Sequence, residues 1–413
     1  MKTGWVFTTR GRKRFLTMFS ALGALLCYTT SGAQPAGIPG SAVDLGQGLF
    51  LGKALVVENV TAWPVYSIKE VANVSRDFVT LADAQEKKLA VVREKGAWPR
   101  DTAQPQGDAV PAQYRSRDRG QRRIRDRRSN RQAQVIQLAA PVDDEPHGTV
   151  NELVIENRGN KPILVLAGTL LKGGKQDRQV GQDFIVPPRK TVPVEAFCVE
   201  QGRWTARRDG EHTRGVFRAK KSLTVKGVRS SGQFKKDQGK VWERVASENR
   251  KAGKAPRSGT FMATVEETEK KAVARREKIS RALSEDFIEK SKAAKAPVGF
   301  AYAVDGKVKE VRTFTHPLIF QRFFETLFST VAMEADLAQR EAAARKRPIY
   351  KKTADKKQVV DLVGGARRIK MKKTRTKAGS VIRERKSEKI WNADCYENDG
   401  DAEPATKSFM LAE

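Results

Sequence analysis

The stretch from Val298 to Phe314, VGFAYAVDGKVKEVRTF, carries the strongest fold signal in the chain. Two apolar runs, Val298 to Val304 and Lys307 to Phe314, flank the pair Asp305-Gly306. An Asp-Gly pair between two such runs is typical of a two-residue turn in which both residues have a positive φ. The stretch therefore predicts an antiparallel β-hairpin.

The residues after the hairpin predict a long amphipathic helix. Thr315 is the expected cap, Pro317 is tolerated in the first turn, and His316 fits a cap better than a metal ligand. A wide apolar stripe at helical spacing is expected to pack against the sheet, and it contains Phe320, Phe323, Phe324, Leu327, Phe328 and Val331. Residues 265–292 predict a second, highly charged surface helix with a thinner stripe of Val273, Ile279, Leu283 and Phe287.

Earlier segments predict further strands. Leu153 to Asn157 and Pro162 to Ala167 predict two strands joined at Gly159-Asn160. Thr191 to Val199 predicts another, and because Pro193 has no amide proton, this strand is expected to begin at a sheet edge. Together the segments predict an α+β fold, mainly an antiparallel sheet with flanking amphipathic helices.

The N-terminal segment has the three parts of a secretory signal peptide. Basic residues from Lys2 to Arg14 precede the apolar stretch Phe15 to Tyr28, and Ser31-Gly32-Ala33 is suited to cleavage before Gln34. The apolar stretch is shorter than the roughly 20 residues that span a bilayer. We therefore expect a signal peptide over residues 1–33, no transmembrane span in the mature chain, and a periplasmic or extracellular location.

The chain is strongly basic. It has 79 Lys and Arg against 48 Asp and Glu, and removal of residues 1–33 would leave 74 against 48, a net charge of +26. Such an excess favours anionic partners. We expect an anionic polymer or surface as a partner; the alternative is that the charge only keeps the protein soluble.

The charge is concentrated in two segments that define the expected domain organisation. Residues 34–95 and 134–345 are expected to form one core domain. Residues 96–133 contain an Arg-rich run and too few apolar residues to order themselves, so they predict a disordered insertion, either a polyanion-binding arm or a solvated linker. Residues 346–413 predict a basic tail, an appendage in which Val359 to Val363 and Ile390-Trp391 form short strands and the acidic stretch Asp394 to Glu403 folds back on the basic residues.

Two dense polar clusters end apolar runs, and the first is Lys172 to Arg178. It is not a nucleoside triphosphate-binding loop, because Gly174 stands where that motif has lysine and Gln176 where it has a hydroxyl. Gly173-Gly174 allows a turn with exposed amides among Lys172, Lys175 and Arg178, which predicts an anion cradle. The alternative is a basic hairpin turn.

The second polar cluster is Glu200 to Trp204. Its carboxylate, amide, guanidinium and indole can orient a planar polar ligand, with paired hydrogen bonds from Arg203 and a stacking face on Trp204. The alternative is an internal ion pair between Glu200 and Arg203, with Trp204 covering the end of the sheet.

Three features resemble the ADP-ribosylglycohydrolase- and rhodanese-phosphatase-associated protein domain family: the Gly-Lys-Gln turn at 174–176, the run Cys198 to Trp204, and the late hairpin followed by a helix. Lys236 to Trp242 resembles a further family element. The resemblance names no activity, because the family is known by its company with enzymes of ADP-ribose and phosphate metabolism. The candidate ligand-binding residues are Lys172, Lys175, Gln176, Asp177, Arg178, Glu200, Gln201, Arg203, Trp204 and Gln238, with Asp237 and Trp242 at lower weight.

No catalytic or metal site can be named from the sequence. His147, His212 and His316 are far apart and no cysteine pair has ligand spacing, so we expect neither a metal nor another cofactor. Thr169-Leu170 departs from the acidic residue that many relatives carry there, and no nucleophile elbow is present. An acid and base pair drawn from Glu195, Glu200, Asp177 and Asp183 stays open, as does pairing of Cys198 with Cys395.

Two functions from different classes follow. The first is a non-catalytic ligand- or partner-binding domain, with basic arms for anionic envelope polymers. The alternative is an enzyme or sensor that acts on an ADP-ribose-like or other phosphorylated nucleotide ligand. The export signal argues mildly against the alternative, because such nucleotides are mainly cytoplasmic.

Overall fold

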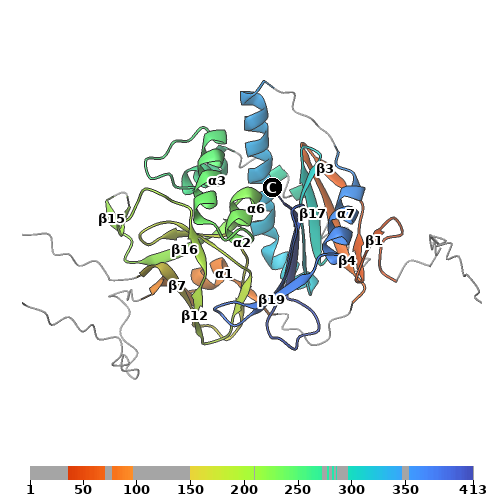
Figure 1. Ribbon diagram of the computed structural model, residues 1–413, viewed down its shortest axis with the longest axis horizontal. Helices are drawn as coiled ribbons and strands as arrows, with labels where there is room; N and C mark the ends of the chain where they lie inside the picture. Colours follow the sequence, from red (N-terminus) through yellow and green to blue (C-terminus); the bar gives the residue numbers. More distant parts are fainter. Residues whose placement is uncertain are drawn as a thin grey trace, which may run out of the picture. The chain divides into compact units, whose positions relative to one another are not determined.

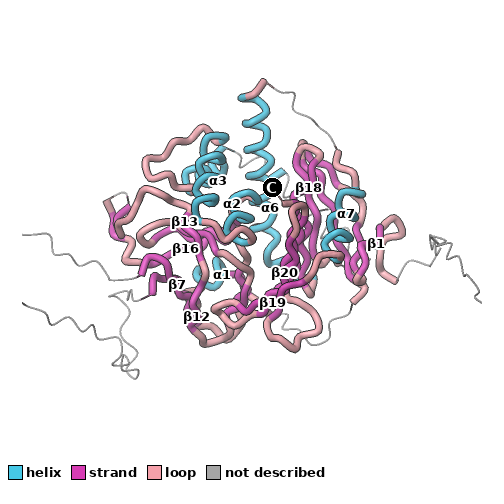
Figure 2. The backbone as a smooth tube through the Cα atoms, viewed as in Figure 1, coloured by secondary structure: helices cyan, strands magenta, loops and turns pink. Residues whose placement is uncertain are grey.

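The computed structural model describes residues 36–69, 77–95, 149–208, 210–271, 296–346 and 353–412, and short pieces at 277–278, 281–282 and 285 (Figure 1). The predicted signal peptide at 1–33 and the predicted insertion at 96–133 lie outside these residues. The described chain is α+β, as predicted, with both helices and strands throughout (Figure 2). It has six helices, and its strands pair antiparallel with one exception.

The largest element is a ten-stranded antiparallel sheet with the strand order β1-β2-β4-β17-β18-β22-β21-β20-β19, and β3 also pairs with β4. Its strands are β1 (Val43–Gly46), β2 (Leu49–Leu51), β3 (Leu55–Val57), β4 (Val60–Ser67), β17 (Gly299–Val304), β18 (Lys307–Phe314), β19 (Met371–Arg375), β20 (Val381–Lys386), β21 (Ile390–Tyr396) and β22 (Thr406–Leu411). The sheet therefore combines the two ends of the described chain with the predicted hairpin.

The predicted hairpin is confirmed at the centre of this sheet. Strands β17 and β18 pair antiparallel, and Asp305 and Gly306 between them have φ values of 50° and 74°. Side chains alternate across the sheet, so that Phe300 and Tyr302 join one apolar core and Ala301 joins another on the opposite face. Both faces of the hairpin are buried.

Helix α6 (Pro317–Ala344) covers one face of the ten-stranded sheet, and its predicted stripe of phenylalanines is buried there. The predicted cap is wrong by one residue. His316 has an extended backbone, and its Nδ1 accepts a hydrogen bond from the Leu318 amide at 3.1 Å. Pro317 then stands first in the helix, and His316 fits a cap, as expected.

The C-terminal segment is not an appendage, in contrast to our expectation. Strand β22 lies between β18 and β21 in the ten-stranded sheet, and Phe409 and Met410 are buried. Residues 359–363 are not a strand but part of α7 (Lys356–Arg367), which packs on the face opposite α6. The acidic stretch does fold back on basic residues, with Arg385 Nη1 3.0 Å from Asp394 Oδ2.

A seven-stranded antiparallel sheet holds the two polar clusters, with the order β12-β7-β6-β16-β9-β10-β13. Its strands are β6 (Ala90–Lys95), β7 (Thr149–Asn157), β9 (Thr169–Gly173), β10 (Arg178–Val180), β12 (Thr191–Val194), β13 (Ala196–Cys198) and β16 (Val216–Leu223). Pro193 lies on the edge strand β12, as predicted. The expected single strand over residues 191–199 is broken at Glu195, because its two halves pair with opposite edges of the sheet. This bent segment curls the sheet.

Smaller elements complete the described chain. A three-stranded sheet contains β5 (Val79–Thr80), β8 (Ile163–Val165) and β11 (Phe184–Val186), and β14 (Arg207–Arg208) pairs with β15 (Glu211–His212). The remaining helices are α1 (Leu81–Glu86), α2 (Lys226–Gln233), α3 (Gln238–Lys251) and α4 (Met262–Lys271). Helix α4 is the described part of the predicted charged helix, whose apolar residues Val273, Ile279, Leu283 and Phe287 lie outside the described residues. Of the helices described, none combines the length and apolarity needed to cross a membrane.

Candidate functional site

The two polar clusters meet in space. Strand β10 pairs with β13 so that Arg178 lies opposite Cys198, which brings the turn at 174–177 against the segment after β13. The Asp177 amide donates to Glu200 Oε2 at 2.9 Å, and Gln176 Nε2 donates to the Gln201 carbonyl at 3.3 Å. The clusters therefore form one site, a question that the sequence left open.

Arg203 binds both clusters together. Its Nε and Nη2 donate to the Glu200 carboxylate at 2.8 to 3.2 Å. Nη2 also donates to the Gly173 carbonyl at 3.2 Å, and Nη1 donates to the carbonyls of Gly174 at 2.7 Å and Thr205 at 3.0 Å. Because an arginine has five N–H groups, this set of acceptors uses its whole donor capacity. The internal ion pair, one of the two readings of the sequence, is present.

Asp177 is the buried centre of the network, with no exposed side-chain surface. Arg208 donates to its two oxygens at 2.6 and 2.7 Å, Thr260 donates at 2.6 Å, and the Gly173 amide donates at 3.0 Å. Burial lowers the pKa of Arg208, but its hydrogen bonds to Asp177 and the charge of that carboxylate outweigh burial, so the pKa is raised. Sequence reasoning missed Arg208 and Thr260, since neither lies near Asp177 in the chain.

The glycine turn is closed rather than open to a ligand. The Gly174 amide donates to the Val216 carbonyl at 3.1 Å, and the Lys175 amide donates to Glu94 Oε1 at 2.8 Å. With the Gly173 amide held by Asp177, three successive amides of the turn have protein acceptors. The predicted cradle of exposed amides is therefore wrong. Gly174 is required for close packing, because its φ is 49° and an added Cβ would lie 2.1 Å from Phe217 Cζ.

Three further candidates face the protein interior. Arg178 is 1% exposed and donates to Gln176 Oε1 at 3.1 Å; burial lowers the pKa of this guanidinium, against the opposing charges of neighbouring acidic groups. The side-chain amide of Gln238 hydrogen-bonds both the backbone amide and the backbone carbonyl of Cys198 at 2.8 Å.

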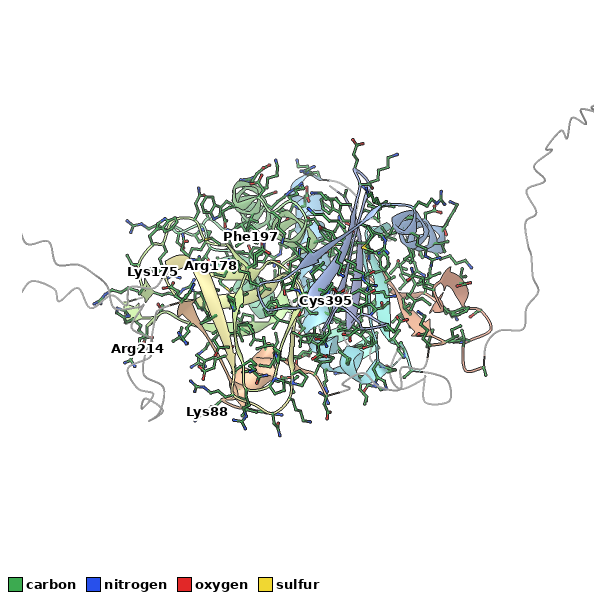
Figure 3. The ribbon with its side chains drawn as sticks, turned by 60° about the horizontal axis from the view of Figure 1, so that its bottom comes forward. Lys88, Lys175, Arg178, Phe197, Arg214 and Cys395 are labelled. Atoms are coloured by element: carbon green, nitrogen blue, oxygen red, sulfur yellow. The ribbon has the colours of Figure 1, made fainter. Side chains whose placement is uncertain are left out.

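Figure 3 shows Lys175 and Arg178 on the same side of the protein, away from Cys395. Cys198 and Cys395 lie in different sheets, and both are free and buried.

An open cleft of about 730 Å³ lies directly beside this network, and we call it the Trp204 cleft. Trp204 is 55% exposed there, and Arg207 and Arg257 are exposed on its border. Lys172 Nζ is held by Glu266 Oε1 at 2.5 Å. In the described part of the chain, neither Arg207 nor Arg257 has a side-chain ion pair. The residues that line the Trp204 cleft are Lys172, Glu200, Gly202, Arg203, Trp204, Thr205, Arg207, Arg208, Pro256, Arg257, Ser258, Thr260, Met262, Ala263 and Glu266.

The carboxylates considered as an acid and base pair are divided among different places. Glu195 pairs with Lys236 at 2.9 Å on the surface. Asp183 is buried and accepts from Arg312 Nη1 at 3.0 Å. Asp177 and Glu200 are neighbours, but arginine, threonine and backbone donors already surround them. Asp237 caps α3 by accepting from the Lys240 amide at 2.9 Å.

Metal chemistry has no support in the described residues, where no group of three or more His, Cys, Asp or Glu side chains is placed to hold an ion. The Cys198 thiol is also unsuited to nucleophilic attack, because burial raises its pKa above the ordinary value. The arrangement can therefore bind charge and stack a ring, and within the described residues no side-chain group in it is placed to hold a metal ion.

A family model covers most of the chain. The ARG and Rhodanese-Phosphatase-superfamily-associated Protein domain matches residues 48–395, which contain the seven-stranded sheet, both polar clusters and the hairpin with its helix. No curated protein and no solved structure matches the chain. The resemblance expected from the two polar clusters and the hairpin is confirmed, and the chain belongs to the ARG and Rhodanese-Phosphatase-superfamily-associated Protein domain family.

Proposed function

We propose that the chain is an exported, non-catalytic binding protein whose Trp204 cleft takes a small nucleotide-like ligand, with one planar ring and one or more phosphate groups. One observation carries the proposal: the exposed Trp204 ring and the exposed, unpaired guanidinium groups of Arg207 and Arg257 border the same cleft, within the described residues. The export part rests on the sequence pattern of residues 1–34.

The ring and the cations supply complementary interactions. A tryptophan that is 55% exposed at a cleft border offers its face to a planar ring, and such stacking is worth about 1–3 kcal/mol per base. Arginine pairs with phosphate through two parallel hydrogen bonds, and Arg207 and Arg257 have donors to give. The lining has five basic and two acidic residues, so the cleft favours an anion. The volume of about 730 Å³ is in the range of sites for small molecules.

Binding without turnover is favoured by the state of the two carboxylates in the site. A general base needs a free lone pair within hydrogen-bond reach of the substrate. Asp177 accepts from Arg208, Thr260 and Gly173, and Glu200 accepts from Arg203 and the Asp177 amide. Both acids are 1% exposed or less. The alternative is an enzyme or sensor for the same ligand class. An enzyme needs one of these carboxylates to be released from its hydrogen bonds, whereas a sensor without turnover does not.

The network beside the cleft has a positioning role in this proposal. Arg208 and Thr260 line the cleft and are fixed by Asp177, while Arg203 fixes the segment that ends in Trp204. A ligand that stacks on Trp204 therefore meets a rigid wall. Of the residues named from the sequence, Trp204 is the one that we expect to touch the ligand directly. Lys172 lines the cleft but is paired with Glu266, and Gln176, Arg178 and Gln238 support the wall from inside.

Thermal-shift titration with ADP-ribose tests the proposal. A ligand at 100 times its Kd stabilises a protein by about 2.7 kcal/mol, and we expect a clear rise in Tm for the wild type. The rise should be lost in Trp204→Ala and in the double variant Arg207→Gln/Arg257→Gln. It should persist in Arg250→Gln/Arg368→Gln, which removes two exposed arginines outside the cleft.

Two controls separate the parts of the proposal. Inorganic pyrophosphate should raise the Tm less than ADP-ribose does, because it has no ring to stack on Trp204. An equal rise in Tm would contradict the stacking role of Trp204. Incubation of the wild type with ADP-ribose, followed by chromatography, should return the ligand unchanged. Turnover would favour the enzyme alternative, and no Tm shift with any nucleotide would reject the site.

A further inference from the structure

A second cleft, outside the site above, is lined by six basic and two acidic residues and has a volume of about 570 Å³. Strands β19 and β20 at the edge of the ten-stranded sheet form one wall, and the loop at Lys235-Lys236 after α2 forms the other. Phe234 and Ile382 add apolar lining. We call it the β19 cleft. The basic tail predicted from the sequence thus contributes to a folded surface.

Two lysines at the start of β19 line this cleft. Lys370 directly precedes the strand, and Lys372 and Thr374 lie within it. Because side chains alternate along a strand, Lys372 and Thr374 share one face and lie ~6.6 Å apart, twice the ~3.3 Å rise per residue. All five residues of β19 are exposed. An extended polymer with negative groups along its length would meet both lysines.

Several cations of the cleft are already engaged. Lys236 pairs with Glu195 at 2.9 Å, Lys386 donates to the Phe234 carbonyl at 2.8 Å, and Lys235 lies 5.5 Å from the Trp391 ring centre. Across the described chain, Lys370 and Lys372 have no ion pair, although Lys372 lies opposite Glu384 in the β19–β20 pairing. Arg375 also lines the cleft, and its Nη1 donates to the Gly379 carbonyl at 3.2 Å. The ammonium groups of Lys370 and Lys372 are available to a ligand.

The uncharged polar groups indicate what kind of polyanion fits. Gln182 lines the cleft and is 8% exposed, and within the described residues its buried Oε1 has no hydrogen-bond partner. A sugar hydroxyl can donate to such an oxygen, whereas the charged phosphodiester or carboxylate group of a polyanion cannot. The Thr374 hydroxyl adds a further polar contact on the same wall.

Two other polyanions fit less well. Single-stranded nucleic acid binds on exposed aromatic rings, but the ring in this cleft, Phe234, is 3% exposed and stacked on Trp391 at 5.3 Å. An acidic peptide added to the free edge of β19 would lie in the plane of the sheet. There it would miss Lys235 and Lys236 on the opposite wall.

We infer that the β19 cleft binds an acidic polysaccharide, with Lys370 and Lys372 pairing its carboxylate or sulfate groups and Gln182 and Thr374 contacting its hydroxyls. This inference goes beyond the proposed function, because it concerns a different cleft and a polymeric partner. It also differs from a polymer bound by the Arg-rich insertion, since every residue in it belongs to the described part of the chain.

Binding of the full chain to immobilised polygalacturonate at about 0.15 M salt tests the inference, since ion pairs of this kind persist only in part at that salt. Lys370→Gln/Lys372→Gln should weaken binding about tenfold, and the conservative pair Lys370→Arg/Lys372→Arg should restore it. The matched control is Lys53→Gln/Lys307→Gln, which should change binding less than about twofold. Both lysines are exposed and lie outside the cleft, Lys53 in the loop between β2 and β3 and Lys307 at the start of β18.

Three results would overturn the inference. Equal weakening of polygalacturonate binding by Lys370→Gln/Lys372→Gln and by Lys53→Gln/Lys307→Gln would mean that only the net charge of the protein matters. Unchanged binding in Lys370→Gln/Lys372→Gln would place the polymer elsewhere. Tighter binding of oligothymidylate or polyglutamate than of polygalacturonate, with the same lysine dependence, would assign the cleft to nucleic acid or to an acidic peptide. Circular dichroism of each variant confirms that the fold is intact.

Discussion

The Trp204 cleft and the β19 cleft are both lined by an excess of basic residues, but they use their cations differently. Beside the Trp204 cleft, Arg203 is paired with Glu200 and Arg208 with Asp177. The arginines without an ion pair in the described chain, Arg207 and Arg257, lie at the border of the cleft. In the β19 cleft, Lys372 on the exposed strand β19 and Lys370 directly before it have no ion pair in the described chain.

The comparison shows that a charged side chain is available to a ligand only when it is not already paired within the protein. The two polar clusters, Lys172 to Arg178 and Glu200 to Trp204, mostly hold the curled sheet together. An arginine in such a network rigidifies the wall of a site, whereas an arginine or lysine without a partner recognises the ligand. The comparison predicts large stability effects from the network and small ones from the cleft borders.

The largest effect is expected for Asp177→Ala. The substitution removes the acceptor of Arg208 and Thr260 and leaves buried positive charge without compensation, which costs about 3–5 kcal/mol. Urea unfolding measures the loss. Glu195→Ala, which removes a half-exposed surface pair with Lys236, should cost about 0–1 kcal/mol. Similar losses in the two variants would contradict the division between network and border.

A smaller but still clear effect is expected at the glycine turn. Gly174→Ala forces a side chain into a positive-φ position and against Phe217, at a cost of about 2–3 kcal/mol. The matched control is Gly364→Ala in α7, where an added Cβ meets no atom within 4 Å and a gain of about 0.5–1 kcal/mol is expected. Thermal unfolding should move in opposite directions; a tolerated Gly174→Ala would mean that the turn is open.

The smallest effect concerns pH and the β19 cleft. Burial raises the pKa of Glu384 in the folded chain, against the nearby charges of Lys236, Lys386 and Lys372. Between its pKa in the unfolded chain and its raised pKa in the folded chain, the unfolded state binds fewer protons, so stability falls as pH rises through that window. Glu384→Gln should remove this fall. Urea unfolding from about pH 4 to about pH 7 checks it, and identical pH profiles would contradict it.

The sequence predicted the local parts of the fold well, since their signals lie within a few residues. The Asp305-Gly306 turn and the stripe from Phe320 to Val331 are examples, because turn chemistry and helical spacing act over short distances. Residues 359–363 were misread as a strand from their short apolar run. The spacing of Val359, Leu362, Val363 and Ala366 was the helical signal, and Asp355 caps the helix.

The candidate site was predictable only in part. The ion pair between Glu200 and Arg203 is local, and it was one of the two interpretations of the second polar cluster. Arg208, Thr260 and Arg257 were missed, because the curl of the seven-stranded sheet and the loop before α4 bring them to the site. Sheet pairing over long sequence separations decides these contacts, and no spacing rule encodes it. Arg207 is only three residues from Trp204 and was missed because it lies just beyond the second cluster. The same holds for the C-terminal strands, whose place beside β18 depends on buried residues such as Phe409.

Calorimetric titration of two ligands against two double variants tests the central claim, that available cations rather than total charge define the two sites. ADP-ribose and polygalacturonate would each be titrated into wild type, Arg207→Gln/Arg257→Gln and Lys370→Gln/Lys372→Gln. We predict that the arginine pair loses ADP-ribose and keeps polygalacturonate, and that the lysine pair does the reverse. Equal weakening of both ligands by both pairs would contradict the account.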